Sequence, residues 1–127
     1  MNNTFFITGT DTGIGKTFVT CILMQFIKFH HKRVIGMKPI AAGVDIKKGE
    51  ISNEDVNLLQ YESSLKLKVG EINTYSFDEA IAPHIAAQKY NIEIDFKKIK
   101  MHAASLKSQT DYLLIEGAGG YLVPLGE

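Results

Sequence analysis

The stretch Gly9-Thr10-Asp11-Thr12-Gly13-Ile14-Gly15-Lys16-Thr17 follows directly after the apolar run Phe5-Phe6-Ile7. A strand, a glycine-rich turn, a Lys-Thr pair and an apolar helix form, in this order, a cradle for nucleotide phosphates. Backbone N–H groups of such a loop, together with the N-terminus of the following helix, point at the anion. The sequence therefore predicts a phosphate-binding loop at residues 9–17, called loop 9–17 below.

Two side chains at the end of loop 9–17 have chemistry that suits a nucleotide. Lys16 is placed to reach the terminal phosphates, and the hydroxyl of Thr17 is placed to contact Mg²⁺. Five residues separate Gly9 from Gly15, one more than in the usual spacing. The alternative is a glycine-rich turn with an accidental Lys-Thr pair, which explains neither the glycine spacing nor the apolar helix that follows.

The composition of the 127 residues excludes several classes of protein. The 14 basic and 14 acidic residues cancel, so no excess charge points to a nucleic-acid partner. The single cysteine, Cys21, permits no internal disulfide and fits a reducing compartment. The N-terminus lacks the charges of a signal peptide, and no apolar run is long enough for a membrane span. We therefore expect a cytoplasmic protein with no membrane partner.

The apolar segment at residues 121–125 suggests that residues 1–127 are one domain at the start of a longer chain.

Apolar runs alternate with helix-like segments along the chain. Strands are expected at Thr4–Thr8, Val34–Met37, Asn73–Phe77 and Tyr112–Glu116. Helices are expected at Lys16–His31, after an N-cap at Ser52 or Asn53, at Ala82–Tyr90 and at Asp95–Lys107. The first helix is apolar on nearly every side, so we expect it to be buried. The alternation predicts a P-loop NTPase-like α/β fold with a mainly parallel sheet between two helical layers.

Polar residues follow the strands at the carboxyl edge of the predicted sheet, where ligands of parallel α/β folds bind. Lys38 ends the second strand, beside small residues at 41–43 that leave room for a ligand; the alternative is a solvated strand end. Glu116 ends the fourth strand, where a carboxylate binds or orients Mg²⁺. Asp55, in a first helical turn, is either a further metal ligand or an acid that stabilises the helix dipole. Oxygen ligands favour Mg²⁺ over zinc.

Five blocks of the sequence, kept in one order, resemble dethiobiotin synthetases, the ATP-dependent enzymes that close the ureido ring in biotin synthesis. The blocks are loop 9–17, Lys38-Pro39-Ile40-Ala41-Ala42-Gly43, Asn53-Glu54-Asp55, Ala82-Pro83-His84-Ile85-Ala86-Ala87, and Glu116-Gly117-Ala118-Gly119-Gly120 with Leu122-Val123-Pro124-Leu125. The five-residue gap in loop 9–17 is the family's own variant. A phosphate loop alone is unspecific, whereas the five blocks together are specific.

The resemblance implies a ligase that converts 7,8-diaminononanoate, CO₂ or bicarbonate, and ATP into dethiobiotin, ADP and phosphate, with Mg²⁺ as cofactor. One amine captures CO₂ as a carbamate, and ATP phosphorylates this carbamate to a carbamic-phosphoric anhydride. The neighbouring amine attacks the anhydride, closes the cyclic urea and expels phosphate. The resemblance also implies a homodimer.

The resemblance further implies a role for each matching residue. The catalytic residues are Lys16 at the phosphates, Lys38 at the carbamate and Thr12 at the carbamate or substrate oxygens. The metal ligands are Thr17, Asp55 and Glu116. The nucleotide contacts are Asp11, Thr12, Gly13, Ile14, Gly15, Lys16, Thr17, Asp55 and Glu116, and the substrate contacts are Thr12, Lys38, Ala42 and Gly119. The chain departs from the family at Gly13, where many members carry Glu, and family chains continue past Glu127.

Three other functions share parts of the pattern. ATPase switches of the chromosome-partitioning type carry a second lysine early in the loop, where this chain has Asp11. Amide-forming ligases of the cobyrinate type have the same fold, but Lys38-Pro39 with Asn53-Glu54-Asp55 favours the biotin enzyme. An inactive truncated remnant that folds without turnover is the third alternative, which an activity assay distinguishes.

Overall fold

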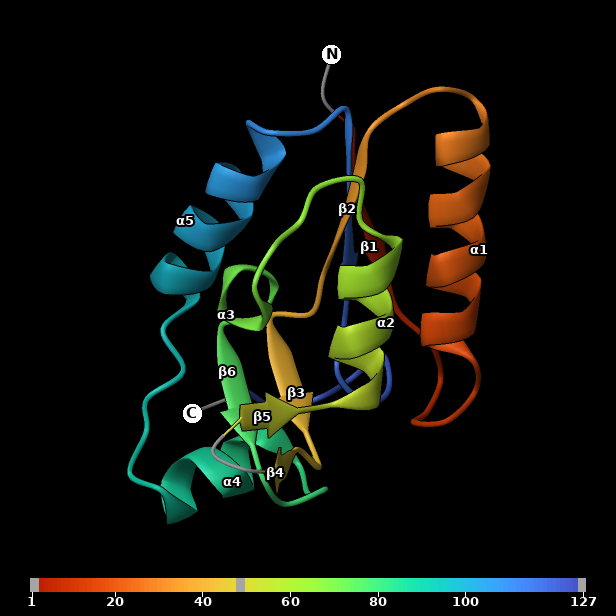
Figure 1. The fold of residues 1–127 in the computed structure, drawn as a ribbon. Coiled ribbons are helices and arrows are strands. Elements are labelled where there is room, and N and C mark those ends of the chain that lie inside the picture. Colours follow the sequence, from red (N-terminus) through yellow and green to blue (C-terminus); the bar gives the residue numbers. More distant parts are fainter. Residues whose placement is uncertain (1–2, 48–49, 126–127) are drawn as a thin grey trace.

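A computed structural model describes residues 3–47 and 50–125 (Figure 1). Its main sheet has three parallel strands in the order β1-β7-β2. They are β1 (Asn3–Ile7), β2 (Val34–Met37) and β7 (Tyr112–Glu116). Leu113 of the central strand is in register with Thr4 on one side and Ile35 on the other. The α/β fold with a parallel sheet, which the alternating apolar runs predict, is therefore confirmed.

Helices cover both faces of this sheet (Figure 1). The helices of the described chain are α1 (Lys16–Phe29), α2 (Glu54–Glu62), α3 (Val69–Ile72), α4 (Pro83–Lys89) and α5 (Phe96–Lys107), of which α4 packs outside the main sheet. The helices α1 and α2 contact each other on one face, and α5 lies on the other. The side chains of Asn53 and Asp95 cap α2 and α5, because each accepts a hydrogen bond from a first-turn N–H group.

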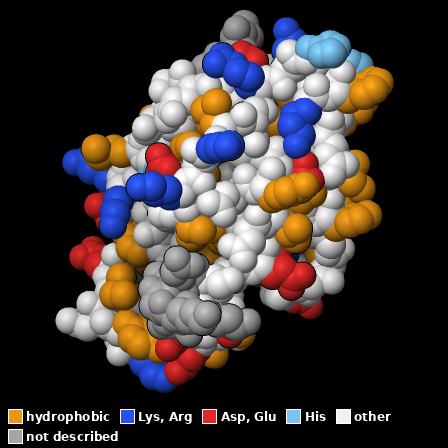
Figure 2. Space-filling model, viewed as in Figure 1, with side chains coloured by type: hydrophobic (Ala, Val, Ile, Leu, Met, Phe, Trp, Pro, Cys, Tyr) orange, Lys and Arg blue, Asp and Glu red, His pale blue; other side chains and the backbone are white. Residues whose placement is uncertain are grey.

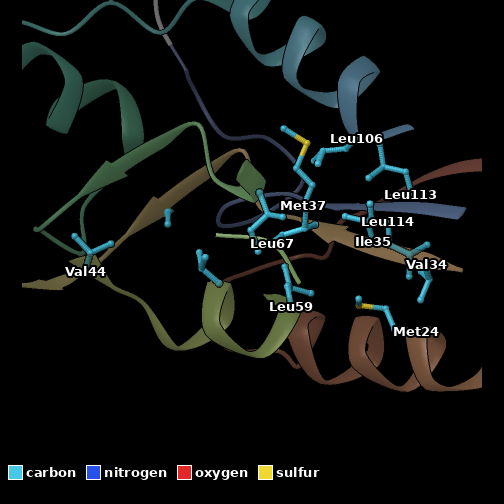
Figure 3. Close-up of a cluster of buried hydrophobic side chains, with 13 residues drawn as sticks. Met24, Val34, Ile35, Met37, Val44, Leu59, Leu67, Leu106, Leu113 and Leu114 are labelled. Atoms are coloured by element: carbon cyan, nitrogen blue, oxygen red, sulfur yellow. The ribbon is translucent and has the colours of Figure 1, made fainter. Parts of the chain in front are cut away.

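The hydrophobic core fills the space on both sides of β2 and β7 (Figure 3). Leu113 and Leu114 are adjacent in β7 and both buried, and neighbouring side chains of a strand point to opposite faces. Met24 of α1 and Leu59 of α2 close the core on one side, while Leu106 of α5 closes it on the other. The continuous apolar runs of β2 and β7 are thus explained by burial on both faces.

The helix α1 is not buried all round, which corrects the prediction from its composition. Its buried residues are Lys16, Thr20 and Met24. Phe18, at 70% exposure, is one of several large apolar residues on its outer side, and Figure 2 shows orange side chains along the edge of the molecule that α1 occupies. In the described part of the chain β1 pairs with β7 alone, and its Phe6 is 65% exposed. An apolar helix is buried all round only where other elements pack on every side of it. In the described chain, other elements cover only one side of α1.

Two further strand pairs extend from the end of β2. A parallel pair joins β3 (Ile40–Ala42) to β6 (Tyr75–Phe77), and an antiparallel pair joins β4 (Asp45–Lys47) to β5 (Glu50–Ser52). The strand expected at Asn73–Phe77 is therefore shorter than predicted and lies outside the main sheet. Phe77 packs with Ala86 of α4 in a second buried cluster. Within the described residues, no helix is long and apolar enough to cross a membrane.

Candidate active site

Loop 9–17 joins β1 to the first turn of α1, and its glycines fix its shape. Gly13 and Gly15 have φ angles of 74° and 98°, a left-handed backbone that disfavours a side chain. Gly15 is the N-cap of α1, no side chain caps this helix, and its first turn holds no acid. The first N–H groups of α1 and the positive end of its dipole are therefore available to an anion.

The side chain of Lys16 folds back over the same loop. Its Nζ donates a hydrogen bond to the backbone carbonyl of Asp11 at 2.7 Å. Asp11 in turn accepts a hydrogen bond on Oδ1 from the N–H of Thr12, also at 2.7 Å. A carbonyl is a neutral acceptor, so this contact orients the ammonium of Lys16 without cancelling its charge.

Lys38, Asp55 and Glu116 come from three different elements and meet at the carboxyl edge of the main sheet. Lys38 Nζ lies 2.8 Å from Asp55 Oδ2 and 2.8 Å from Glu116 Oε1. Thr17 Oγ1 donates a hydrogen bond of 2.7 Å to the same Glu116 oxygen. Because β2 and β7 are neighbouring parallel strands, Lys38 at the end of one and Glu116 at the end of the other arrive side by side.

Burial makes the charges of this cluster depend on one another. Glu116 is fully buried and the side chain of Lys38 is 6% exposed, so each compensates the desolvation of the other. Partial burial tends to raise the pKa of Asp55. The hydrogen bond from Lys38, with the charges of Lys38 and Lys16, outweighs this and holds the pKa of Asp55 below its ordinary value. Asp55 is therefore ionised at neutral pH.

Two cavities meet at the cluster. The first, of about 320 Å³, opens on loop 9–17 and is lined by Thr12, Gly13, Gly15, Lys16, Thr17, Phe18, Lys38, Asp55, Glu116 and Gly119. The second, of about 410 Å³, adds Ala42 and a mostly apolar wall made by residues 80–83 and 122–124. Both cavities are lined by Thr12, Lys38, Asp55 and Gly119. A charged group bound in the first cavity can thus contact a ligand held in the second.

The oxygen atoms of Thr17, Asp55 and Glu116 fit a magnesium ion. Glu116 Oε2 is buried, and no hydrogen-bond partner for it occurs among the described residues. A buried carboxylate oxygen without a partner is costly, and a hard cation satisfies it. Across residues 3–47 and 50–125, no group of three His, Cys, Asp or Glu side chains could hold a metal ion. The set of Thr17, Asp55 and Glu116 differs from such a group because its third ligand is a hydroxyl.

Some predicted site residues lie away from the cavities, and some residues that shape the site were not predicted to do so. Asp11 and Ile14 do not line either cavity, and the side chain of Ile14 instead lies over Gly9. Asn73 was not predicted to act at the site, although its Nδ2 donates a hydrogen bond of 2.7 Å to the Lys38 carbonyl. The apolar wall of the second cavity was not predicted either. Residues 82–83 and 122–124 belong to two of the five sequence blocks, but no local pattern relates these segments to each other.

A larger cleft, of about 1230 Å³, lies between α3, β6 and α5, away from loop 9–17. Several of its polar groups have partners within the protein. Asn73 bonds to two backbone carbonyls, and His102 Nδ1 lies 2.8 Å from Thr74 Oγ1. Lys68 and Lys98 line the cleft, but no Asp or Glu of the described chain does, so it lacks the lysine–carboxylate cluster found at the edge of the main sheet.

Comparison with known proteins agrees with this geometry. Residues 3–127 match the family model described as an AAA domain. The chain is 44% identical over 127 residues to the ATP-dependent dethiobiotin synthetase BioD of Nitrosospira multiformis, covering 100% of this chain and 54% of that protein. It is 42% identical over 123 residues to the protein of the same name in Aromatoleum aromaticum, covering 97% and 55%. It thus spans about half the length of the curated relatives it matches. The resemblance to dethiobiotin synthetases that the five sequence blocks indicate is confirmed.

Proposed function

The chain belongs to the AAA domain family, and we propose that it forms the nucleotide- and carbamate-binding part of an ATP-dependent dethiobiotin synthetase. The observation that carries the proposal is the meeting of Thr17, Lys38, Asp55 and Glu116 beside loop 9–17. A phosphate loop alone fits many nucleotide-binding proteins. The buried lysine between two carboxylates, open to a second cavity, adds the means to hold an anion next to the phosphates.

Loop 9–17 is proposed to bind the phosphates of ATP. The free N–H groups in the first turn of α1 supply fixed donors, and Lys16 exchanges the Asp11 carbonyl for a phosphate oxygen. This exchange is favourable because a charge-assisted hydrogen bond to an anion is stronger than one to a neutral carbonyl. The same charge stabilises the phosphoryl group during its transfer.

Thr17, Asp55 and Glu116 are proposed to hold Mg²⁺, which when bound supplies positive charge beside the phosphate oxygens. The hydrogen bond from Thr17 to Glu116 orients two of the three ligands before any metal arrives. The lowered pKa of Asp55 keeps the third ligand ionised at neutral pH. These residues are thus arranged in advance for a hard divalent cation.

The second cavity is proposed to hold 7,8-diaminononanoate. Its apolar wall suits a hydrocarbon chain, and Thr12, Lys38, Ala42 and Gly119 also line it. An amine held here attacks CO₂ and loses a proton to give a carbamate, whose negative charge Lys38 stabilises. The carbamate oxygen then attacks the γ-phosphorus of ATP and expels ADP. The second amine attacks the resulting anhydride at carbon, closing the ring as phosphate leaves, and confinement of both amines favours this step.

The family resemblance also leads us to propose a homodimer that acts in the cytoplasm. Its small-molecule partners are then ATP, 7,8-diaminononanoate and CO₂ or bicarbonate, with Mg²⁺ as cofactor. Light scattering of the purified protein tests the dimer, with a mass of two chains expected.

The activity is tested by incubating the protein with 7,8-diaminononanoate, bicarbonate and MgATP and measuring dethiobiotin by mass spectrometry. We expect product from the wild-type protein and none from Lys38→Ala. In parallel, calorimetry with MgADP measures nucleotide binding, which Lys16→Met weakens at least tenfold and Lys28→Met leaves unchanged. Lys28 is a suitable control because it pairs with Glu62, away from both cavities. A folded protein that binds no nucleotide would contradict the proposal. If the protein binds nucleotide but forms no dethiobiotin, the proposed nucleotide site is supported and the proposed ring closure by these residues is contradicted.

A further inference from the structure

We propose that the ammonium of Lys38 is the resident counter-cation of Asp55 and Glu116, and that a divalent metal competes with it for these two carboxylates. Metal binding then releases Lys38 into the second cavity, where it becomes available to an anionic substrate. The inference rests on the proposed function for the identity of the metal and of the substrate anion.

Lys38 Nζ lies between the carboxylates of Asp55 and Glu116. It lies 2.8 Å from one oxygen of Asp55 and 2.8 Å from one oxygen of Glu116. It therefore occupies a place from which one cation touches both carboxylates. Because Glu116 is fully buried, its charge would be poorly compensated without the lysine.

The charges of Lys38, Asp55 and Glu116 favour the binding of a divalent cation. Without metal, Lys38 is the cation that directly contacts both carboxylates, and Lys16 acts on Asp55 only through its charge. Glu116 has a further buried oxygen with no partner among the described residues. The cluster of Lys38, Asp55 and Glu116 thus has one ammonium for two carboxylates, and the unpartnered oxygen of Glu116 attracts a divalent cation. Once that cation contacts Asp55 and Glu116, its repulsion of the nearby ammonium weakens the two ion pairs of Lys38. The two cations therefore bind antagonistically.

The surroundings of Lys38 show where its side chain goes. Lys38 lines both cavities, so the ammonium can turn from the metal ligands toward the second cavity by side-chain rotation. Two hydrogen bonds hold the backbone of Lys38 in place while its side chain rotates. The N–H of Lys38 donates to the Ile72 carbonyl at 2.9 Å, and its own carbonyl accepts from Asn73 at 2.7 Å. Metal loading is therefore expected to precede productive contact between Lys38 and the substrate anion.

The test measures binding of Mn²⁺ alone to the nucleotide-free protein by electron paramagnetic resonance. Lys38→Met removes the competing charge and keeps most of the side-chain volume. We expect it to bind Mn²⁺ at least tenfold more tightly than the wild type. Lys28→Met, which removes a different lysine–carboxylate pair, is expected to match the wild type. Equal or weaker binding of Mn²⁺ by Lys38→Met would overturn the proposal.

A second measurement covers the case in which Lys38→Met does not fold. The wild-type protein, labelled with ¹⁵N at its lysine side chains, is titrated with Mg²⁺ while the ammonium signals are followed. The Lys38 signal, identified by its absence from Lys38→Arg, should shift or exchange faster with water as metal binds. An unchanged Lys38 signal at saturating Mg²⁺ refutes competition. Neither measurement uses ATP or diaminononanoate, so failure of the dethiobiotin assay leaves this result interpretable on its own.

Discussion

Thr17 at the start of α1 donates a hydrogen bond of 2.7 Å to Glu116 at the end of β7, across 99 residues of sequence. This bond joins loop 9–17 to the central strand of the main sheet. Because Glu116 is fully buried, the bond also fixes which of its two oxygens faces Lys38 and which is left without a partner. The orientation of the carboxylate is thus set by a residue that itself belongs to the proposed metal site.

We predict that Thr17→Val weakens MgADP binding at least tenfold. The substitution keeps the shape of the side chain but removes a proposed metal ligand and one of the two donors to Glu116 Oε1. Loss of this hydrogen bond should also lower the free energy of unfolding by about 1 kcal/mol. Calorimetry measures the first effect and urea unfolding the second.

Thr20→Val is the matched control for this prediction. Thr20 lies one turn further along α1 and its hydroxyl donates to the Lys16 carbonyl at 2.7 Å, within the helix. Its removal should leave MgADP affinity within twofold of the wild type. Equal losses of affinity in the two variants would show that Thr17 acts through helix stability and not through the metal site.

The elements that the sequence predicts well are those whose pattern reflects local chemistry. β2 and β7 are continuous apolar runs of the expected length, and Asn53 and Asp95 are capping residues followed by helix formers. The gathering of Lys38 and Glu116 at one edge was also predictable, because it follows from strand direction in a parallel sheet.

The features that the sequence does not predict depend on contacts between distant segments. β3 and β6 have three residues each and are stabilised by pairing with residues 35 positions away, as in Ile40 with Tyr75, which leaves no local period to detect. The burial of α1 was overestimated because composition does not reveal which surfaces cover a helix. That Lys38 bridges two carboxylates is likewise a product of three converging elements.

We predict that the Lys28–Glu62 ion pair stabilises the protein at neutral pH and loses this effect in acid. Burial tends to raise the pKa of Glu62, but hydrogen bonds from Lys28 and Gln25 and the charge of Lys28 hold it below the ordinary value of 4.5. A lowered native pKa adds stability above the unfolded value, and this stability is lost as the pH falls through the native pKa. Glu62→Gln should therefore destabilise by about 1–2 kcal/mol at pH 7.

Urea unfolding at several pH values tests the effect of Glu62→Gln. Its difference from the wild type should shrink as the pH falls below 4.5. In a Lys28→Met background the pH-dependent part of the difference should be smaller, because the principal partner of Glu62 is absent. A difference that stays constant from pH 7 to pH 3 would contradict the assignment to this ion pair.

We predict opposite effects from alanine at two glycines. A Cβ at Gly36 in β2 would lie 3.0 Å from Leu59 Cδ2 and from Met24 Cε, two fully buried side chains. Gly36→Ala should therefore destabilise by about 1–3 kcal/mol through overpacking. A Cβ at Gly70 in α3 would meet nothing within 4 Å, so Gly70→Ala should stabilise by about 0.5–1 kcal/mol. Urea unfolding at pH 7 measures both, and equal effects would contradict the packing argument.

The last prediction concerns the contact between the segment after β7 and loop 9–17. A Cβ at Gly120 would lie 2.8 Å from the Thr10 carbonyl oxygen and 3.7 Å from Asp11 Cα. These are backbone atoms, so Gly120→Ala must displace loop 9–17 itself and not a flexible side chain. The displacement moves the Asp11 carbonyl that orients Lys16. We expect Gly120→Ala to weaken MgADP binding at least tenfold, measured by calorimetry.

Gly117→Ala provides the comparison, because it lies in the same segment but meets a different neighbour. Its Cβ would lie 2.9 Å from Phe6 Cζ, the tip of a side chain that is 65% exposed and free to turn toward solvent. Gly117→Ala should therefore keep MgADP affinity within twofold of the wild type. If both variants lose affinity equally, the segment after β7 as a whole requires glycine. If Gly120→Ala alone loses it, the close approach of Gly120 to Thr10 is what holds loop 9–17 in its binding shape.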